Sequence, residues 1–338
     1  MTRLLHGGRL QEAARHYGRP AEDWLDLSCA LNPEAWPVPR LPPEVFARLP
    51  EEDDGLTEAA AGFYGTRDLL MLPGTQAAIA TLPNVMPGIR RVWVPACGYE
   101  EHAHCWSREG HQLSRYNVLP EADQLTAGDV LVTIRPNNPL GSCSPLDQLR
   151  ALHARLCELD GLLVADEAFM DATPDQSLIE QHMPEHLVIL RSFGKFFGLA
   201  GLRLGCMVAS TAWRARIEGH LEPWCINNPA RFIARQAYAD ARWHAQARQR
   251  LPEAADRLSS LMRDRLALTA GQVSGCALFV TLHLGAQRAR QVHDGLAKEA
   301  ILVRLFADEG LVRLGLPANA AETERLRDAL TAIAAPQG

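Results

Sequence analysis

The stretch that decides the fold reads Arg191-Ser-Phe-Gly-Lys-Phe-Phe-Gly-Leu-Ala-Gly-Leu-Arg-Leu-Gly205. It follows an apolar run, residues 187–190, that is typical of a strand, and a second apolar run begins at Leu204. Lys195 is therefore expected in a loop, buried among Phe193, Phe196 and Phe197. Nearly all of the 34 Lys and Arg residues are arginines, so a lysine at this point needs an explanation, although an ordinary surface lysine is the simplest alternative.

The residues around Lys195 predict a site for a small anionic aldehyde. A lysine amine forms a Schiff base with a carbonyl where its surroundings favour the neutral amine. The Ser192 hydroxyl and the Arg203 guanidinium could bind an anion close to that amine. Pyridoxal phosphate (PLP) is the commonest ligand that carries both an aldehyde and a phosphate.

Working outward, short apolar runs alternate with helix-length segments. Strands are expected at residues 69–72, 92–94, 130–134, 162–165, 187–190 and 204–209, and helices at 75–86, 100–109 and 146–159. This alternation predicts an α/β fold with a mainly parallel sheet flanked by helices, connected by right-handed crossovers.

The pattern changes after Trp213, where a smaller α+β module is expected to begin. Residues 230–268 look helical, with a break at Pro252, and strands and helices follow. With a prior of about 150 residues per domain, we expect an N-terminal arm (1–40) that joins the small domain, a large PLP-binding domain (41–222) and a small C-terminal domain (223–338).

Polar residues that follow the strands are the candidate ligand contacts, because such folds bind ligands at strand ends. Asp166 follows 162–165, and its carboxylate could keep a pyridine nitrogen protonated; a helix cap or a metal-binding Asp-Glu pair is the alternative. The helix after Gly74-Thr75-Gln76 offers free amide hydrogens to an anion, although a plain helix cap would read the same way.

Two further candidates follow strands 130–134 and 92–94. The Asn138 amide could hydrogen-bond the phenolic oxygen of a PLP ring, although Asn-Pro is most often only a turn. Tyr99 could stack on the ring, or it could be a buried packing residue. His102 and His104 differ by two positions and so point to different faces of a helix, and we predict no metal site.

Composition excludes several classes of protein. The formal net charge is -6 and the pI is near 6.1, which gives no electrostatic reason to expect nucleic acid. The eight cysteines form no CxxC pair, which indicates free thiols in a reducing compartment. The N-terminus lacks the apolar run of a signal peptide, and charges interrupt every apolar stretch before about 18 residues. A cytoplasmic protein without a membrane span is expected.

Together, five segments resemble the class I and II aminotransferase-like superfamily: Gly74-Thr-Gln, Tyr99, Asn138-Pro-Leu-Gly, Asp166-Glu-Ala-Phe and the stretch from Lys195 to Arg203. Within it the chain resembles the histidinol-phosphate aminotransferases and, more closely, the threonine-phosphate decarboxylases of cobalamin biosynthesis. The closer resemblance rests on His6-Gly-Gly, on Leu25-Asp-Leu-Ser running to Asn32-Pro, and on Pro223-Trp-Cys-Ile-Asn227.

The resemblance implies a fold-type I PLP enzyme and a role for each candidate. Lys195 would form the Schiff base, Asp166 would contact the pyridinium, Asn138 would contact the ring oxygen and Tyr99 would stack on the ring. The cofactor phosphate would be held by Gly74, Thr75, Gln76, Ser192 and Arg203. Substrate would contact His6, Gly7, Asn138, Arg304 and Arg313. A homodimer is implied as well, because fold-type I sites take residues from both subunits.

Two arginines suit a substrate with a carboxylate and a phosphate, because a guanidinium binds either in a bidentate manner; ordinary salt-bridged arginines are the alternative. The chain departs from the family's pattern at several positions. Ala30 replaces an asparagine of the arm, Leu49 a tyrosine that reaches the partner subunit's cofactor phosphate, Phe169 a tyrosine able to bind the ring oxygen, and Gly194 a serine before the lysine.

The resemblance implies decarboxylation of L-threonine O-3-phosphate to (R)-1-amino-2-propanol O-2-phosphate. The residues alone do not decide whether the carboxylate or the hydrogen leaves the α-carbon. One alternative is therefore an aminotransferase for histidinol phosphate or an aromatic amino acid. Another is a non-catalytic PLP-binding subunit of the corrinoid pathway, suggested by the changes at Ala30, Leu49 and Phe169.

Overall fold

The computed structural model describes residues 7–334 of the 338-residue chain, so His6 lies outside the described residues. The chain divides into two compact units. The small unit comprises the chain up to Glu34, the segment Pro139–Ser142 and the chain from Arg248 onward, and the large unit comprises Ala35–Asn138 and Cys143–Ala247. Each unit is described by itself.

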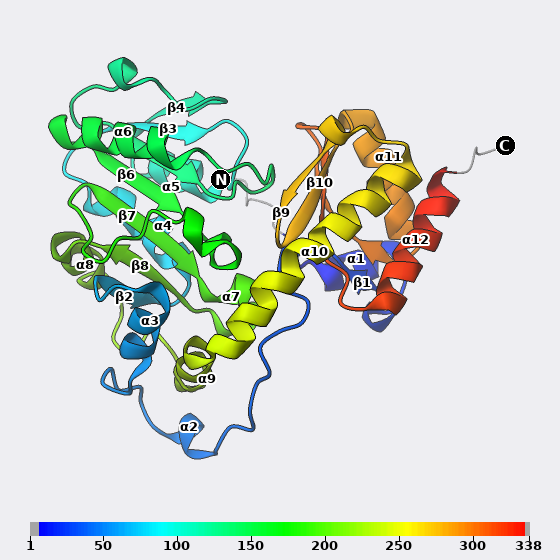
Figure 1. Ribbon diagram of the computed structural model, residues 1–338, viewed down its shortest axis with the longest axis horizontal. Helices are drawn as coiled ribbons and strands as arrows, with labels where there is room; N and C mark the ends of the chain where they lie inside the picture. Colours follow the sequence, from blue (N-terminus) through cyan, green and yellow to red (C-terminus); the bar gives the residue numbers. More distant parts are fainter. Residues whose placement is uncertain (1–6, 335–338) are drawn as a thin grey trace. The chain divides into compact units, whose positions relative to one another are not determined.

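The large unit is built on a seven-stranded sheet with the strand order β2-β8-β7-β6-β5-β3-β4 (Figure 1). Its strands are β2 (Leu69–Leu72), β3 (Arg91–Pro95), β4 (Gln112–Tyr116), β5 (Val130–Ile134), β6 (Leu162–Asp166), β7 (Leu187–Ser192) and β8 (Gly205–Ala209). Only β8 runs antiparallel to its neighbours β2 and β7, while the remaining pairs are parallel. The predicted mainly parallel sheet is confirmed.

The large unit also contains helices, most of which cover this sheet. They are α2 (Glu44–Ala47), α3 (Leu56–Tyr64), α4 (Thr75–Val85), α5 (Glu101–Arg108), α6 (Leu146–Glu158), α7 (Phe193–Phe196), α8 (Thr211–Glu218) and α9 (Asn228–Ala239). Every residue of β5, β6 and β8 is buried, as expected where both faces of a parallel sheet are covered. On one face Ile79 of α4 and Trp106 of α5 join alternate strand residues such as Val132 and Val164 in one core cluster. The strand ends are therefore held on a rigid frame.

The small unit contains a four-stranded antiparallel sheet with the order β12-β13-β10-β9. Its strands are β9 (Val273–Cys276), β10 (Phe279–His283), β12 (Arg304–Phe306) and β13 (Leu311–Gly315), and its helices are α1 (Leu10–Tyr17), α11 (Ala286–Lys298) and α12 (Ala320–Ala334). A separate parallel pair joins β1 (Leu25–Asp26) to β11 (Ile301–Leu302). This pair ties the residues before Ser28 to the segment that leads into Arg304.

Helix α10 (Ala241–Leu266) corrects one prediction. Pro252 lies inside this helix and does not break it. The break in the helical region falls at Asp240, between α9 and α10, where the Asp240 carboxylate accepts a hydrogen bond of 3.0 Å from Trp243 N. This capping bond satisfies an amide that the first turn of a helix leaves without a partner.

The division between the compact units lies within α10, between Ala247 and Arg248. Helix α9 therefore belongs to the large unit, although the sequence pattern changes earlier, after Trp213. In the part of the chain that the structure describes, no helix combines the length and apolar character that crossing a membrane requires.

Candidate active site

Lys195 lies in α7, directly after the carboxyl end of β7. It is half-buried, and its Nζ lies 5.4 Å from the centroid of the Phe169 ring. The expectation that Lys195 is buried among the neighbouring phenylalanines is wrong. The Phe193 and Phe197 rings instead stack on each other with centroids 4.4 Å apart, and both contact Tyr238 of α9. The amine lies near Phe169, in the loop after β6.

Gly194 has a steric reason to lack a side chain. A Cβ built on it would lie 2.7 Å from Ala200 Cα, closer than two carbon atoms can approach without a shift of the backbone. The serine that many relatives carry before the lysine would not fit this turn unchanged. The close approach of Ala200 therefore explains why this chain has a glycine at position 194.

Asp166 ends β6 on the sheet edge that also presents Lys195. It is paired across the sheet with Ile134 of β5 and Leu190 of β7, so the ends of three neighbouring strands lie side by side. Its carboxylate accepts a hydrogen bond of 3.1 Å from Ala168 N. The parallel register therefore brings the carboxylate and the lysine segment to one place.

His102 is the second partner of Asp166, and sequence reasoning did not find it. Its Nε2 lies 3.0 Å from Asp166 Oδ2, and the two residues are only 2% and 5% exposed. Because an ionised carboxylate only accepts hydrogen bonds, the imidazole donates from Nε2. The sequence offered one indication of this contact, namely that a histidine occurs in the helix after Tyr99. Within residues 7–334, no cluster of His, Cys, Asp and Glu suits a metal ion.

The predicted anion-binding residues come together around Gly205. This residue is paired with Leu72 of β2 and with Ser192 of β7, and a Cβ on it would lie 3.1 Å from Thr75 N. A Cβ on Gly74 would lie 2.9 Å from Arg203 Nη2, so the guanidinium covers the start of α4. A helix N-terminus, a hydroxyl and a guanidinium in one place fit a phosphate group.

Gln76 and Tyr99 are joined by a hydrogen bond. The Tyr99 hydroxyl donates to Gln76 Oε1 at 3.0 Å, and Gln76 Nε2 donates to Glu101 Oε2 at 3.0 Å. Burial raises the pKa of Tyr99, the charges of Glu101 and Asp166 raise this pKa further, and Arg203 lowers it. Tyr99 thus lies within electrostatic reach of both Asp166 and Arg203, where a stacking side chain is expected.

The segment after β5 carries Asn138. It begins with a cis peptide bond between Arg135 and Pro136. Asn137 is buried and donates from Nδ2 to the Cys97 carbonyl at 3.1 Å, while Asn138 is half-buried. Asn137 thus anchors the loop, and Asn138, the predicted ligand contact, follows it directly.

A buried ionic network lies beneath these loops, and sequence reasoning missed it as well. Glu167 accepts from Arg135 at 3.1 Å and from Arg191 at 2.8 Å, and Arg191 also pairs with Asp171. All four residues are buried. The network joins the ends of β5, β6 and β7, which carry Asn138, Asp166 and Ser192, so it fixes the spacing of the candidate residues.

In the small unit, Arg304 of β12 lies directly opposite Arg313 of β13. Both guanidinium groups lie near the Phe306 ring, at 5.1 and 5.9 Å from its centroid. Arg313 Nη2 also donates to the Ser28 carbonyl at 2.8 Å. Burial and the charge of Arg304 lower the pKa of Arg313 to about 10. Two like charges placed together in this way favour an anion as their partner.

The predicted contact Gly7 also lies against Ser28. A Cβ on Gly7 would lie 2.6 Å from the Ser28 carbonyl oxygen, which only a glycine allows without a shift. The structure therefore brings Gly7, Arg304 and Arg313 together within the small unit.

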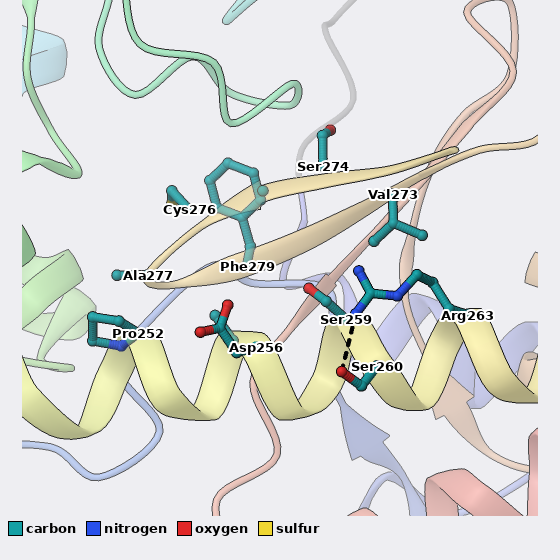
Figure 2. Close-up of a pocket in the computed structure, with 12 residues that line it drawn as sticks. Pro252, Asp256, Ser259, Ser260, Arg263, Val273, Ser274, Cys276, Ala277 and Phe279 are labelled. Atoms are coloured by element: carbon teal, nitrogen blue, oxygen red, sulfur yellow. Dashed lines mark hydrogen bonds between the residues drawn. The ribbon is translucent and has the colours of Figure 1, made fainter. Parts of the chain in front are cut away.

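The small unit also contains a hollow of about 340 Å³ that α10 and the β9–β10 hairpin line, with Pro252, Asp256 and Ser274 among its residues (Figure 2). Of the residues the structure describes, none of the predicted site residues lines this hollow. Phe279, which lines the hollow, contacts one of the predicted site residues, since its ring centroid lies 5.5 Å from the Arg313 guanidinium carbon.

Comparisons with known proteins agree with the resemblance seen in the sequence. The family model for aminotransferase class I and II matches residues 49–333. A threonine-phosphate decarboxylase of Pseudomonas aeruginosa is 44% identical over 336 residues, which are 98% of this chain and 99% of the relative. A threonine-phosphate decarboxylase of Sinorhizobium sp is 37% identical and covers 97% of each chain.

A structural comparison supports the same fold. The crystal structure of histidinol-phosphate aminotransferase from Sinorhizobium meliloti in complex with pyridoxal-5'-phosphate superposes with a TM-score of 0.81 at 19% identity, covering 98% of this chain and 95% of the other. The extent of the family match and the identity to full-length relatives lead to one conclusion: this chain belongs to the aminotransferase class I and II family.

Proposed function

We propose that this chain is a PLP-dependent decarboxylase that converts L-threonine O-3-phosphate to (R)-1-amino-2-propanol O-2-phosphate and carbon dioxide, in cobalamin biosynthesis. The observation that carries the proposal is the similarity over nearly the whole chain to two relatives named threonine-phosphate decarboxylase. The opposed pair Arg304 and Arg313 supports it, because a substrate with a carboxylate and a phosphate uses two guanidinium groups.

The residues of the large unit fit PLP. A phosphate suits the place where the α4 N-terminus, Ser192 and Arg203 meet, and Lys195 supplies the amine. The residues proposed to hold the cofactor are Gly74, Thr75, Gln76, Tyr99, Asn138, Asp166, Ser192, Lys195 and Arg203. When bound, PLP accepts the electron pair that departing carbon dioxide leaves on the α-carbon.

Three side chains of the large unit are proposed to handle protons and charge. The Asp166 carboxylate keeps a proton on the ring nitrogen, since opposite charges favour each other's ionised forms. His102, which donates to Asp166 at 3.0 Å, holds that carboxylate in one orientation. Decarboxylation leaves the α-carbon one proton short, and we assign its delivery to the Lys195 Nζ.

Arg304 and Arg313 are proposed to orient the substrate. Binding energy from the remote phosphate is useful to catalysis where it holds the reacting bond in the productive direction. The carboxylate is then the group that leaves, and the α-hydrogen is retained. His6, Gly7 and Asn138 are proposed as further substrate contacts.

The test is a product assay on the purified protein with PLP. Incubation with threonine phosphate is expected to release carbon dioxide and one equivalent of aminopropanol phosphate. Incubation with histidinol phosphate and 2-oxoglutarate is expected to form no glutamate. Glutamate without carbon dioxide would identify an aminotransferase. Cofactor binding without turnover of any phosphorylated amino acid would favour a non-catalytic role in the corrinoid pathway.

We also propose a homodimer that uses the region around α2. Phe46, Leu49 and Trp224 are 67%, 63% and 59% exposed, and Asn228 Nδ2 donates to the Arg48 carbonyl at 2.7 Å, which joins the two segments that carry them. Exposed large apolar side chains in such number are typical of a protein interface. Sedimentation should give twice the chain mass of 37.2 kDa, and Phe46→Glu should reduce it to a monomer.

A reducing compartment is proposed from the thiols, since none of the eight cysteines, which all lie in the described residues, forms a disulfide. So many cysteines without a disulfide are usual in the cytoplasm. Cell fractionation tests this assignment: recovery of the protein from the periplasmic fraction would overturn it.

A further inference from the structure

Arg9, which no part of the function proposed above uses, lies in the segment that reaches the arginine pair of the small unit. Gly8 N donates to Ser28 Oγ at 2.9 Å, and Ser28 O accepts from Arg313 Nη2 at 2.8 Å. The Gly8 hydrogen bond therefore holds residues 7–9 next to Ser28, the same serine that contacts Arg313. Arg9 is the next residue after this anchor and immediately precedes α1.

The charge of Arg9 acts on the pair. Burial lowers the pKa of Arg304, and the positive charge of Arg9 lowers it further, while Glu309 opposes the shift. Since the pKa of Arg313 is in turn lowered by Arg304, three guanidinium groups from β12, β13 and the start of α1 share one electrostatic environment. An anion bound there would relieve the repulsion among all three.

Arg9 keeps the freedom to meet such an anion. It pairs with Glu12, with Nη1 and Oε2 3.0 Å apart, and the Arg9 side chain is 35% exposed. An exposed i,i+3 ion pair of this type is weak because solvent screens both charges, whereas a hydrogen bond to a charged group in a less exposed site is stronger. A doubly charged anion therefore competes with Glu12 for the guanidinium.

We propose that Arg9 is a third cation of the anion site that Arg304 and Arg313 form, and that it selects a dianionic phosphate over a carboxylate. A phosphate monoester carries a charge near -2 at pH 7 because its second pKa is about 6, while a carboxylate carries only -1. Two guanidinium groups satisfy the carboxylate and one face of the phosphate, and the third adds affinity only where a second negative charge is present. The inference rests on the proposed function and names the residue that makes it selective for a phosphorylated substrate.

The test compares Arg9→Gln and Arg9→Lys with a matched control, Arg15→Gln, which removes an exposed arginine from α1. On the PLP-loaded full-length protein at pH 7.5, we expect Arg9→Gln to raise the KM for threonine phosphate by about tenfold with kcat nearly unchanged. Arg9→Lys should recover part of the loss. The control should match the wild type.

Competition separates a binding role from a structural one. Inorganic phosphate should inhibit Arg9→Gln about tenfold more weakly than wild type, while inhibition by acetate, a monocarboxylate with a single negative charge, should change by less than about twofold. Equal losses for both inhibitors, or an unchanged KM, would overturn the proposal and leave Arg9 as the partner of Glu12 alone.

The two proposals fail in different ways. A wild type that does not turn over threonine phosphate disproves the proposed function, yet calorimetric binding of inorganic phosphate still tests Arg9. In that case weaker phosphate binding by Arg9→Gln than by Arg15→Gln would support the anion site, and equal binding would reject it.

Discussion

His102 Nε2 and Asp166 Oδ2 lie 3.0 Å apart in the interior of the large unit, with both side chains almost fully buried. Helix α5 thereby supports the carboxylate that ends β6. A buried carboxylate is held in one orientation when each oxygen has a donor, and Asp166 has Ala168 N for one and His102 for the other. The pair gives α5 a role in the site that its sequence pattern did not suggest.

We predict that His102→Leu lowers kcat/KM for decarboxylation about tenfold to hundredfold. Losing a hydrogen bond to a charged group costs about 1.5–3 kcal/mol, and each 1.36 kcal/mol is a factor of ten. Steady-state kinetics and the visible absorbance of the bound cofactor measure the change. His104→Leu, two residues along α5 and half-buried, is the control, and an equal loss in both variants would mean that the helix itself was disturbed.

Lys195→Ala should abolish turnover, with a loss of at least about a thousandfold, because the amine is assigned both the covalent contact and the proton transfer. Lys298→Ala is a close control, since Lys298 is the chain's other lysine and is exposed. Borohydride reduction followed by intact mass measurement gives a second readout. Covalent cofactor in Lys195→Ala would contradict the assignment.

Much of this site follows from the sequence because a parallel sheet brings the ends of its strands to one edge. Asp166, Ser192 and Lys195 could be placed from that rule alone, and the register of β6 with β7 agrees with it. His102 could not, because its contact depends on how α5 is rotated on the sheet. The pairing of Glu167 with Arg135 and Arg191 also joins distant segments that no local pattern connects.

The features that the sequence did not predict correctly also have local physical reasons. Strand β4 was not predicted because its sequence, Gln112–Tyr116, is largely polar and it lies at the edge of the sheet. Pro252 was expected to end a helix, but the helix continues because a single proline removes only one backbone donor. The aromatic residues near Lys195 were assigned to the lysine, whereas tertiary packing directs them at one another.

Gly74→Ala should weaken cofactor binding because its Cβ would meet Arg203 Nη2 at 2.9 Å. Gly74 also has φ 81° and ψ 155°, a region that is essentially reserved for glycine and costs other residues about 1–3 kcal/mol. The control must carry the same strain. Gly285 caps α11 with φ 76° and ψ 157°, and a Cβ there would meet nothing within 4 Å.

Both glycine variants are therefore expected to lower the thermal midpoint of the cofactor-free protein by a similar amount. Only Gly74→Ala should raise the Kd for PLP, by about tenfold or more, as followed by titration of protein absorbance or fluorescence. Unchanged affinity in Gly74→Ala would remove Arg203 and the start of α4 from the proposed phosphate site.

Arg304→Gln should make the substrate-free protein more stable while it weakens anion binding. Arg304 and Arg313 are opposed cations, and burial together with Arg304 lowers the pKa of Arg313 to about 10. A lowered pKa means that the fold disfavours the charged guanidinium at every pH below that value. Removing the neighbouring charge therefore stabilises the folded state at neutral pH.

Thermal unfolding should show a higher midpoint for Arg304→Gln than for Arg290→Gln, which changes an exposed arginine of α11. Added inorganic phosphate should reverse the order, because only the paired arginines gain from the anion. A lower midpoint for Arg304→Gln without phosphate would instead show that packing of the arginine on Phe306, at 5.1 Å, outweighs the repulsion.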